Sequence, residues 1–159
     1  MSEVSQHPRV MTVVAELEQL GATGEVRILD GSARTAAQAA EQLGCPVGAI
    51  VNSLVFEADG EALLVLTSGE HRVDTARVAA LVGVSSLGRA DADFVRSHTG
   101  FAIGGVSPVG HPGRLRTLVD RALAAHATIW AAAGHPSAVF PTTYDELLHL
   151  TGGEPADVG

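Results

Sequence analysis

The sequence contains no lysine, since all ten of its basic residues are arginine. Chemistry that requires a side-chain amine is therefore excluded, including Schiff-base formation and the phosphate-loop lysine of nucleotide hydrolases. The single cysteine, Cys45, excludes an internal disulfide and is typical of a reducing compartment, so we expect a cytoplasmic protein. The sequence also lacks a signal-peptide pattern and any apolar run near the ~18 residues of a membrane span, so no membrane partner is expected.

Positive charge is scarce as well. Eighteen acidic residues against ten basic ones give a formal net charge of −8. This balance argues against non-specific binding of duplex DNA, which depends on a basic face, but leaves room for a local contact with the end of an RNA. Hydrophobic residues make up 46% of the 159 residues, enough for a core without disulfides. We expect one domain over residues 1–159, with its core at about 24–150 and a frayed tail at 152–159.

Helices and strands are interleaved without a regular βαβ rhythm. Capping boxes at Thr35-x-x-Gln38 and Thr143-x-x-Glu146 open two of the helices, and Asp59-Gly60 predicts a hairpin turn. Helices are expected at Pro8–Leu20, Thr35–Gly44, Asp74–Val82, Asp91–Thr99 and Thr143–Leu150. Strands are expected at Val26–Leu29, Ile50–Phe56, Ala62–Thr67, Phe101–Ile103, Leu115–Val119, Thr128–Ala131 and Val139–Phe140. The pattern predicts an α+β fold, a single compact domain with a mixed sheet or partly closed barrel flanked by helices.

The common signatures of catalytic and metal sites are missing. Gly105 and Gly110 have phosphate-loop spacing, but His111-Pro112 stands where Lys-Ser/Thr is required. Cys45 follows a helix end, where the dipole disfavours a thiolate, and no Gly-x-Ser-x-Gly elbow is present. No metal is expected, because no two of the seven histidines have the spacing of a paired ligand: His7, His71, His98, His111, His126, His135 and His149.

The segment at residues 100–110, Gly-Phe-Ala-Ile-Gly-Gly-Val-Ser-Pro-Val-Gly, is the most distinctive in the chain. Adjacent glycines permit close approach of a ligand to the backbone, and Pro108 stiffens the loop and pushes Ser107 towards extended geometry. Such a loop can present backbone N–H groups to an oxyanion or a phosphate. A tight turn without a ligand explains the same residues, so both interpretations stay open on local sequence alone.

The loop Gly104–Gly110 resembles the Gly-x-x-x-Pro loop of the YbaK/EbsC (ProX-like) family. These proteins are aminoacyl-tRNA deacylases related to the editing insertion of bacterial prolyl-tRNA synthetase. The resemblance covers roughly Thr35 to Leu147. Further segments fall in family order, namely Ala39-Ala40, Leu43-Gly44, Ile50–Phe56, Arg72-Val73-Asp74, Val78-Ala79, Thr99-Gly100, Thr117–Asp120, Ala127–Trp130 and Gly134.

The resemblance implies hydrolysis of the ester between a wrong amino acid and the terminal adenosine of a tRNA, most often proline tRNA, with water as nucleophile and no cofactor. It implies the aminoacyl-tRNA acceptor end as partner, with a synthetase or tRNA-delivery complex as a further one. The catalytic set carried over is Asn52, Gly104, Gly105, Ser107, Pro108 and Asp120, where Asp120 is either an organiser of the loop or a strand-end cap. The substrate-binding set is Ser53, Thr67, Ser68, Gly69, Val106 and Gly134.

Two departures from the family pattern leave alternatives open. Asn52 stands where the family has its hallmark lysine, and an amide keeps donor capacity but loses charge and reach. A module that binds an aminoacyl end, nucleotide or amino acid without hydrolysis is therefore the alternative to a deacylase. A generic acidic protein-interaction domain would leave the glycine loop unexplained. Ala132-Ala133-Gly134 removes a possible hydroxyl, which favours a small, weakly polar acyl group. Arg72, Arg114 and Arg116 are candidate RNA contacts.

Overall fold

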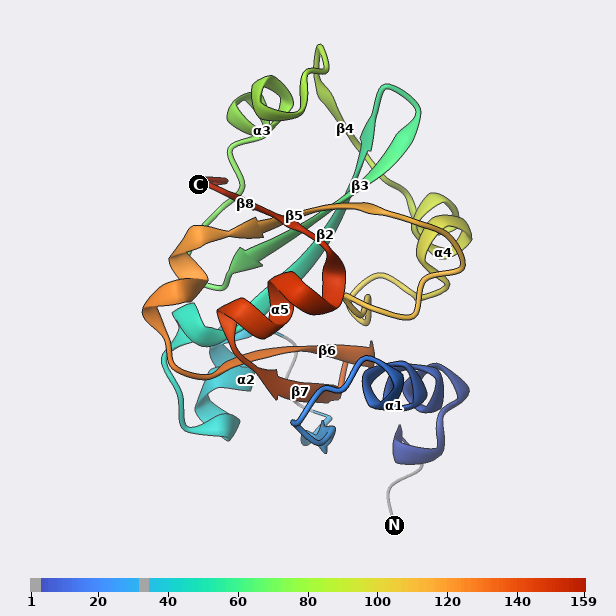
Figure 1. Ribbon diagram of the computed structural model, residues 1–159, viewed down its shortest axis with the longest axis vertical. Helices are drawn as coiled ribbons and strands as arrows, with labels where there is room; N and C mark the ends of the chain where they lie inside the picture. Colours follow the sequence, from blue (N-terminus) through green and yellow to red (C-terminus); the bar gives the residue numbers. More distant parts are fainter. Residues whose placement is uncertain (1–3, 32–34) are drawn as a thin grey trace.

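Two β-sheets carry the fold in the computed structural model, which describes residues 4–31 and 35–159 (Figure 1). The larger sheet has the order β4-β2-β3-β5-β8, formed by Leu87–Arg89, Val51–Ala58, Glu61–Ser68, Arg116–Asp120 and Glu154–Ala156. The smaller has the order β1-β7-β6, formed by Arg27–Ile28, Ala138–Thr142 and Ile129–His135. β5 runs parallel to β3 and β8, whereas the other pairings are antiparallel. The mixed sheets and the helices confirm the α+β prediction. The bridge between Ile50 and Trp130 joins the two sheets, and they do not close into a barrel.

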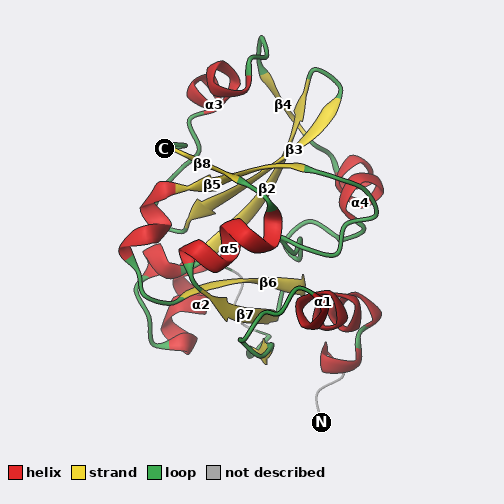
Figure 2. Cartoon of the chain, in the orientation of Figure 1, coloured by secondary structure: helices red, strands yellow, loops and turns green. Residues whose placement is uncertain are grey.

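Five α-helices surround the sheets (Figure 2). They are α1 at Pro8–Gln19, α2 at Ala36–Leu43, α3 at Thr75–Val82, α4 at Ala92–Thr99 and α5 at Tyr144–Thr151, with short 3₁₀ helices η1 at Val4–Gln6, η2 at Val47–Ala49 and η3 at Arg121–Ala125. The capping box at Thr35 is complete, because Thr35 and Gln38 exchange hydrogen bonds between side chain and backbone. The second box is only half formed: Thr143 caps the Glu146 N–H, but the Glu146 carboxylate accepts from Thr142 Oγ1 at 2.7 Å.

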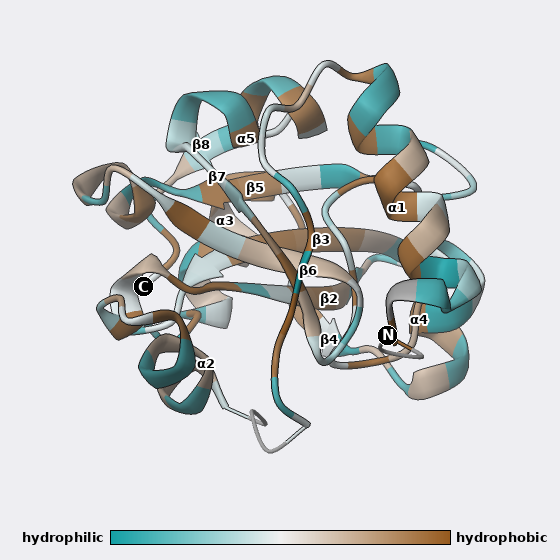
Figure 3. Cartoon of the chain, turned by 90° about the horizontal axis from the view of Figure 1, so that it is seen from below, coloured by the Kyte–Doolittle hydropathy of each residue, from teal (hydrophilic) through white to brown (hydrophobic). Residues whose placement is uncertain are grey.

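The apolar residues divide into two main cores, and the hydrophobic segments of the strands are brown in Figure 3. The larger core fills the space between the sheets, α1 and α5, with Phe101 and Phe140 as its largest fully buried side chains. The smaller core lies under α3 and contains Leu63, Val78 and Val158. The first core packs the glycine-rich loop against the smaller sheet, because Val106 and Val109 belong to it.

The expected strand at Phe101–Ile103 was wrong. Phe101 is 2% exposed and its N–H donates to Thr99 Oγ1 at 3.1 Å, while Gly105 N–H donates to the Ala102 carbonyl at 3.0 Å. These bonds close a turn, and Ile103 is left 59% exposed at its outside. The alternation of β-prone residues was therefore overridden by the Thr99 hydroxyl and by the glycines that follow.

The expectation of a frayed tail at 152–159 was also wrong. β8 adds a parallel strand beside β5, and Asp74 N–H donates to the Val158 carbonyl at 2.7 Å. Ala156 and Val158 alternate along the chain, so both point into the smaller core, where Val158 is fully buried. β4 was not expected either.

Replacing Val158 with alanine is expected to lower the free energy of unfolding by about 1.5–3 kcal/mol, because it deletes buried methyl groups. Asp157→Ala is the neighbouring control, since it removes only an exposed ion pair with Arg121 at 3.2 Å and is expected to cost less than about 1 kcal/mol. Chemical denaturation measures both. Equal effects of the two changes would mean that the tail does not belong to the core.

Candidate functional site

A cavity of about 520 Å³ lies where α2, the start of β2 and the β6–β7 hairpin meet the glycine-rich loop. It brings Asn52 and Gly104 together, as the sequence analysis predicts for a substrate pocket. Its other polar residues are Thr35, His135 and Ser137, and its apolar wall consists of Leu29, Ala36, Ala39, Ile50, Val51, Trp130, Ala132, Pro136 and Val139. The alanines of α2 leave the space open, because they reach little beyond the helix backbone.

Trp130 forms one wall of the cavity and is fixed from two sides. Its backbone pairs with Ile50 across the two sheets, and the Arg27 guanidinium lies 5.9 Å from its ring centroid. A cation over an indole face contributes about 0.5–1 kcal/mol at an exposed site. The wall is therefore anchored at the point where the larger and smaller sheets join.

The glycine-rich loop closes the cavity and lies directly on the hairpin. Gly104 is exposed at φ +90°, a conformation that side-chain-bearing residues rarely adopt. A Cβ on Gly105 would lie 3.0 Å from His135 Cα and 3.2 Å from His135 N and C, so the loop and hairpin backbones are in contact. Ser107 and Pro108 are buried beneath this contact. Gly104 thus permits the positive φ of the loop at the cavity, and Gly105 permits the close packing of the loop on the hairpin.

Ser107 holds the shape of the loop. Its Oγ accepts a hydrogen bond from Val109 N–H at 3.1 Å, and its carbonyl lies 2.7 Å from His111 Nε2. Because a carbonyl only accepts, Nε2 of His111 carries the hydrogen. Burial lowers the pKa of His111, and the bond to the Ser107 carbonyl opposes that shift only in part. His111 is thus a neutral donor that pins the loop, with its ring packed edgewise on Phe101 at 6.1 Å.

The loop also offers unused backbone donors. Within the described part of the chain, no acceptor pairs with the N–H groups of Gly104, Val106 or Ser107. Gly105 N–H, in contrast, closes the turn onto Ala102. Unpaired N–H groups in a fixed, partly buried loop are the arrangement that stabilises an oxyanion. The turn expected from the sequence is therefore present, and the same loop carries three N–H groups without an acceptor among the described residues.

The lowered pKa of His111 predicts an acid-sensitive loop. The unfolded chain, with an ordinary histidine pKa of 6.5, binds a proton more readily than the native state, so the contribution of His111 to stability is full above pH 6.5 and falls as the pH drops below it. Replacement by glutamine removes this titration. We therefore expect the stability of wild-type protein, relative to His111→Gln, to fall as the pH drops below 6.5. Urea unfolding across this range measures the difference, and a constant difference would contradict the prediction.

His135 lines the cavity and was not among the residues chosen from the sequence. Its Nδ1 accepts from Ser137 N–H at 3.0 Å, so in the neutral ring the hydrogen is on Nε2. Burial, followed by the positive charges of His7 and Arg9, lowers the pKa of His135 and favours this neutral form. A β-bulge between Ala132 and His135 sets its position. Bulges are common beside binding sites, but an isolated histidine in a hairpin gives no such signal in the sequence.

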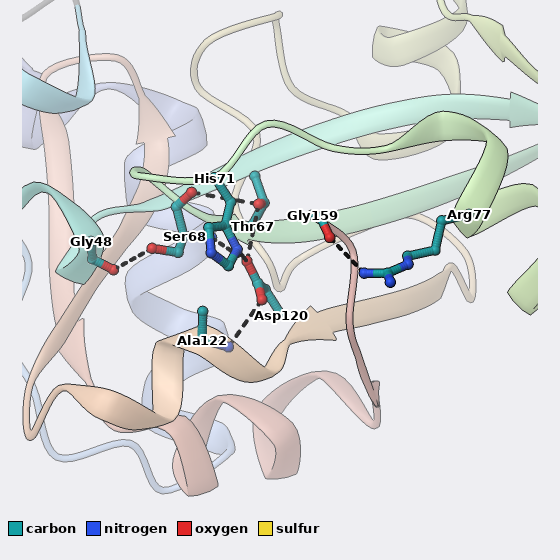
Figure 4. A network of polar contacts seen from close by, with 8 residues as sticks. All are labelled: Gly48, Thr67, Ser68, His71, Arg77, Asp120, Ala122 and Gly159. Atoms are coloured by element: carbon teal, nitrogen blue, oxygen red, sulfur yellow. Dashed lines mark hydrogen bonds and ion pairs between the residues drawn. The ribbon is translucent and has the colours of Figure 1, made fainter.

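Asp120 is 1% exposed and holds three segments together (Figure 4). Its Oδ2 accepts from Thr67 Oγ1 at 3.2 Å and Ser68 N–H at 3.0 Å, and lies 3.0 Å from His71 Nδ1. Its Oδ1 accepts from Ala122 N–H at 3.0 Å and so caps η3. The geometry is that of a strand-end cap, and Asp120 does not line the cavity.

The residues at the end of β3 support the cavity wall without lining it. Thr67 is the register partner of Asn52. Ser68 Oγ donates to the Gly48 carbonyl and Gly69 N–H donates to the Ile50 carbonyl, both at 2.7 Å. These contacts fix the segment that leads into β2, and so they help to position Asn52 near the beginning of that strand.

The remaining predicted residues lie elsewhere. A Cβ on Gly134 would meet the Arg9 carbonyl, so this glycine serves the packing of α1. Ser53 and Val106 line a second, smaller cavity, which Gly104 separates from the first. Arg72 is exposed on the chain between β3 and α3. The other two candidate RNA contacts, Arg114 and Arg116, lie in a cleft beside the β2–β3 turn.

Arg116 is distant from the main cavity and already engaged. On β5, Arg116 lies opposite Leu63 of β3. Leu63 is four residues, or about 13 Å, along β3 from Thr67, the register partner of Asn52. Its guanidinium donates to the Val82 carbonyl at 3.2 Å and forms an ion pair with Glu154 at 3.6 Å. It is thus placed to tie strands and α3 together, and not beside Asn52.

The single cysteine, Cys45, is not among the residues that line the cavity. Burial raises the pKa of the Cys45 thiol, which disfavours the thiolate. Across residues 4–31 and 35–159, no group of three or more His, Cys, Asp or Glu could hold a metal ion. In the same ranges no helix is long and apolar enough to cross a bilayer. What the cavity offers is backbone donors, an amide and a neutral imidazole, which together can bind a carbonyl compound and a water molecule.

Comparison with known proteins shows the family to which the chain belongs. The profile of the aminoacyl-tRNA editing domain family matches residues 30–150. The proline–tRNA ligase of Nitratidesulfovibrio vulgaris is 30% identical over 122 residues, which are 77% of this chain and 20% of the ligase. That of Bacillus licheniformis is 35% identical over 103 residues, 65% of this chain and 18% of the ligase. The chain thus spans about a fifth of the length of these curated relatives.

A solved structure described as a candidate trans-editing enzyme for prolyl-tRNA synthetase superposes with a TM-score of 0.90. It is 44% identical, and the match covers 95% of this chain and 96% of that one. The family match spans most of the chain and includes α2, Asn52, the glycine-rich loop and the β6–β7 hairpin. The resemblance seen in the sequence is thereby confirmed: the chain belongs to the family of YbaK-like aminoacyl-tRNA editing domains.

Proposed function

We propose that this protein hydrolyses the ester of a mischarged tRNA in trans, with proline tRNA carrying a small wrong amino acid as substrate. The observation that carries the proposal is one cavity lined both by Asn52 and by Gly104, whose backbone N–H has no acceptor among the described residues. The likeness to a structure described as a candidate trans-editing enzyme supports the same function. The acceptor end of the tRNA is then the partner, reached in the cytoplasm either directly or through a synthetase.

The chemistry follows from the groups present. Water adds to the ester carbonyl, the oxyanion is stabilised by N–H groups of the loop, and the bond to the ribose oxygen breaks. That oxygen takes a proton from the attacking water, so the products are the free amino acid and a tRNA with its hydroxyl restored. Because His135 carries its hydrogen on Nε2, it acts here as a donor. Preorganised oxyanion donors of this kind are worth about 10²–10³ in rate each.

The cavity also indicates the chemistry of the acyl group. Thr35, Asn52, His135 and Ser137 place polar groups among alanine side chains. A small side chain that can form one hydrogen bond fits this lining better than a charged or large aromatic one. Deacylation of proline tRNA charged separately with alanine, cysteine, serine, threonine and proline tests this. We expect hydrolysis of at least one small wrong ester and sparing of the proline ester. Preference for the proline ester would exclude editing.

Asn52 makes a binding module the second candidate function. A binding module would retain a stable amide analogue of the aminoacyl end and hydrolyse none of the esters. Under the deacylase proposal, Asn52→Ala removes a neutral hydrogen bond and is expected to lower kcat/KM about two- to tenfold. Asn52→Lys is expected to lower it as well, because a charge enters a half-buried cavity beside His135. A large gain from Asn52→Lys would instead indicate a decayed lysine site.

A further inference from the structure

The second cavity, of about 330 Å³, adjoins the first at Gly104 of the loop and at Asn52 and Ser53 of β2. It is bounded by β2, by the chain that follows β4, by α4 and by the outer side of the loop. Its lining residues are Ser53, Leu54, Val55, Phe56, Arg89, Ala90, Val95, Ile103, Gly104 and Val106. Gly104 lines both cavities, so a molecule held at the loop backbone can extend into each of them.

One side of this second cavity is an open strand edge. β2 pairs with β4 only from Phe56 to Ala58, and within the described residues no strand pairs with its 53–55 segment on that side. An open edge presents backbone N–H and C=O groups alternately. Loop residues Ile103, Gly104 and Val106 line the same cavity, whose volume of about 330 Å³ suits a small molecule. A flat heterocycle with donors and acceptors along one side suits such an edge.

Ser53 supplies an independent sign of a missing partner. Within the described residues, its Oγ is the buried side-chain polar atom that has no hydrogen-bond partner. A buried, unsatisfied hydroxyl is costly, so such groups are rare unless a ligand or water completes them. Both carboxylate oxygens of the buried Asp120, in contrast, accept hydrogen bonds. Because Ser53 lines the cavity, a polar atom of the occupant can complete this hydroxyl once the side chain rotates towards it.

The rest of the lining is suited to a flat, uncharged ring and an adjoining phosphate. Val95 and Val106 are buried apolar side chains, and Ile103 is 59% exposed at the rim. Arg89 is exposed beside them, and no ion pair or hydrogen bond engages its guanidinium within the described part of the chain. In a protein with a net charge of −8, an unengaged arginine at the mouth of an apolar cavity favours an anionic neighbour such as a phosphodiester.

We propose that this second cavity binds the heterocyclic base of the terminal adenosine, while the first cavity holds the aminoacyl group. The inference rests on the proposed deacylase function. An aminoacylated nucleoside carries its ester and its base on different carbons of one ribose, which matches two compartments that share Gly104. β2 and Ser53 bind the edge of the base, Val95, Val106 and Ile103 pack on its faces, and Arg89 binds the 5′-phosphate.

The test uses a stable amide probe, 3′-seryl-amino-3′-deoxyadenosine 5′-phosphate, added to the isotope-labelled full chain. We expect shifts of the backbone amide resonances of Ser53, Ala90 and Val106. A probe without the base is expected to bind roughly 5- to 150-fold more weakly, as base stacking contributes about 1–3 kcal/mol. Shifts confined to Trp130 and Ala132, or equal affinity of the two probes, would overturn the assignment.

Two variants locate the base and the phosphate. Ala90→Phe fills the cavity and is expected to abolish the advantage of the complete probe over the probe without the base. Ala92→Phe is the matched control, because Ala92 is exposed and does not line the cavity. Arg89→Gln is expected to remove the advantage of the 5′-phosphate over the plain nucleoside, about two- to fivefold. An unchanged base preference in Ala90→Phe would overturn the proposal.

The deacylase function and the placement of the adenosine base can be tested separately. Hydrolysis of mischarged tRNA by the wild-type chain tests the proposed function alone. The dependence of probe binding on the base tests the placement of the adenosine alone, because an amide probe is not hydrolysed. A deacylase whose KM is the same for Ala90→Phe and Ala92→Phe would refute this inference and leave the function intact.

Discussion

Replacing Asp120 with alanine is expected to lower the free energy of unfolding by about 3–5 kcal/mol, because two backbone N–H groups and a hydroxyl lose their acceptor in a buried site. Ser68 N–H and Thr67 Oγ1 belong to the end of β3, and Ala122 N–H begins η3. Water cannot replace the carboxylate easily, since Asp120 is only 1% exposed. The change thus loosens the junction between β3 and β5 in the larger sheet. Equilibrium unfolding in urea measures the loss.

Asp91→Ala is the matched control for this prediction. Asp91 also caps a helix, but it is exposed and accepts one bond, from Phe94 N–H at 2.8 Å. Its loss is expected to cost about 0.5–2 kcal/mol. Equal costs at the two aspartates would refute the structural role of Asp120. Deacylation then separates the two interpretations of this residue: a cap leaves kcat/KM of the folded fraction near wild type, whereas a catalytic group would lower it by about 10²-fold or more.

Elements with a local signal could be predicted from the sequence. Asp74, Asp91 and Thr143 each cap a helix whose beginning they predicted. The hairpin turn could also be predicted from the sequence, because Asp59 and Gly60 adopt φ values of +50° and +88° that few other residues tolerate. In each case a residue within the segment determines the conformation, so no distant partner is needed to recognise it.

Elements that depend on a distant partner could not be predicted. β8 has three residues and includes a proline, and it becomes a strand only because β5 offers a free edge and the smaller core accepts Val158. The candidate site shows the same limit. Asn52 and Gly104 were found through resemblance to a family, whereas His135 reaches the cavity through a bulge that no local pattern indicates.

Replacing Gly105 with alanine is expected to lower kcat/KM for deacylation by up to about tenfold, since the contact requires a shift of a few tenths of an ångström and a displacement of about 1 Å at reacting groups costs about 100-fold. The added Cβ would lie 3.0 Å from His135 Cα, and both partners are backbone, so neither can rotate away. The loop must therefore shift relative to the hairpin. The shift moves the backbone N–H of Gly104, the loop residue that lines the cavity proposed for the aminoacyl group, away from the position of the ester oxygen.

Gly113→Ala is the control for Gly105→Ala, because no atom lies within 4 Å of its added Cβ. It is expected to retain wild-type activity and stability. Loss of kcat with retained binding of the amide probe would assign the effect to the transition state, because the donors act on charge that develops only there. Wild-type kcat in Gly105→Ala would mean that the loop backbone does not stabilise the oxyanion. Hydrolysis would then depend on Asn52 and His135, the other polar groups of the cavity that can orient water.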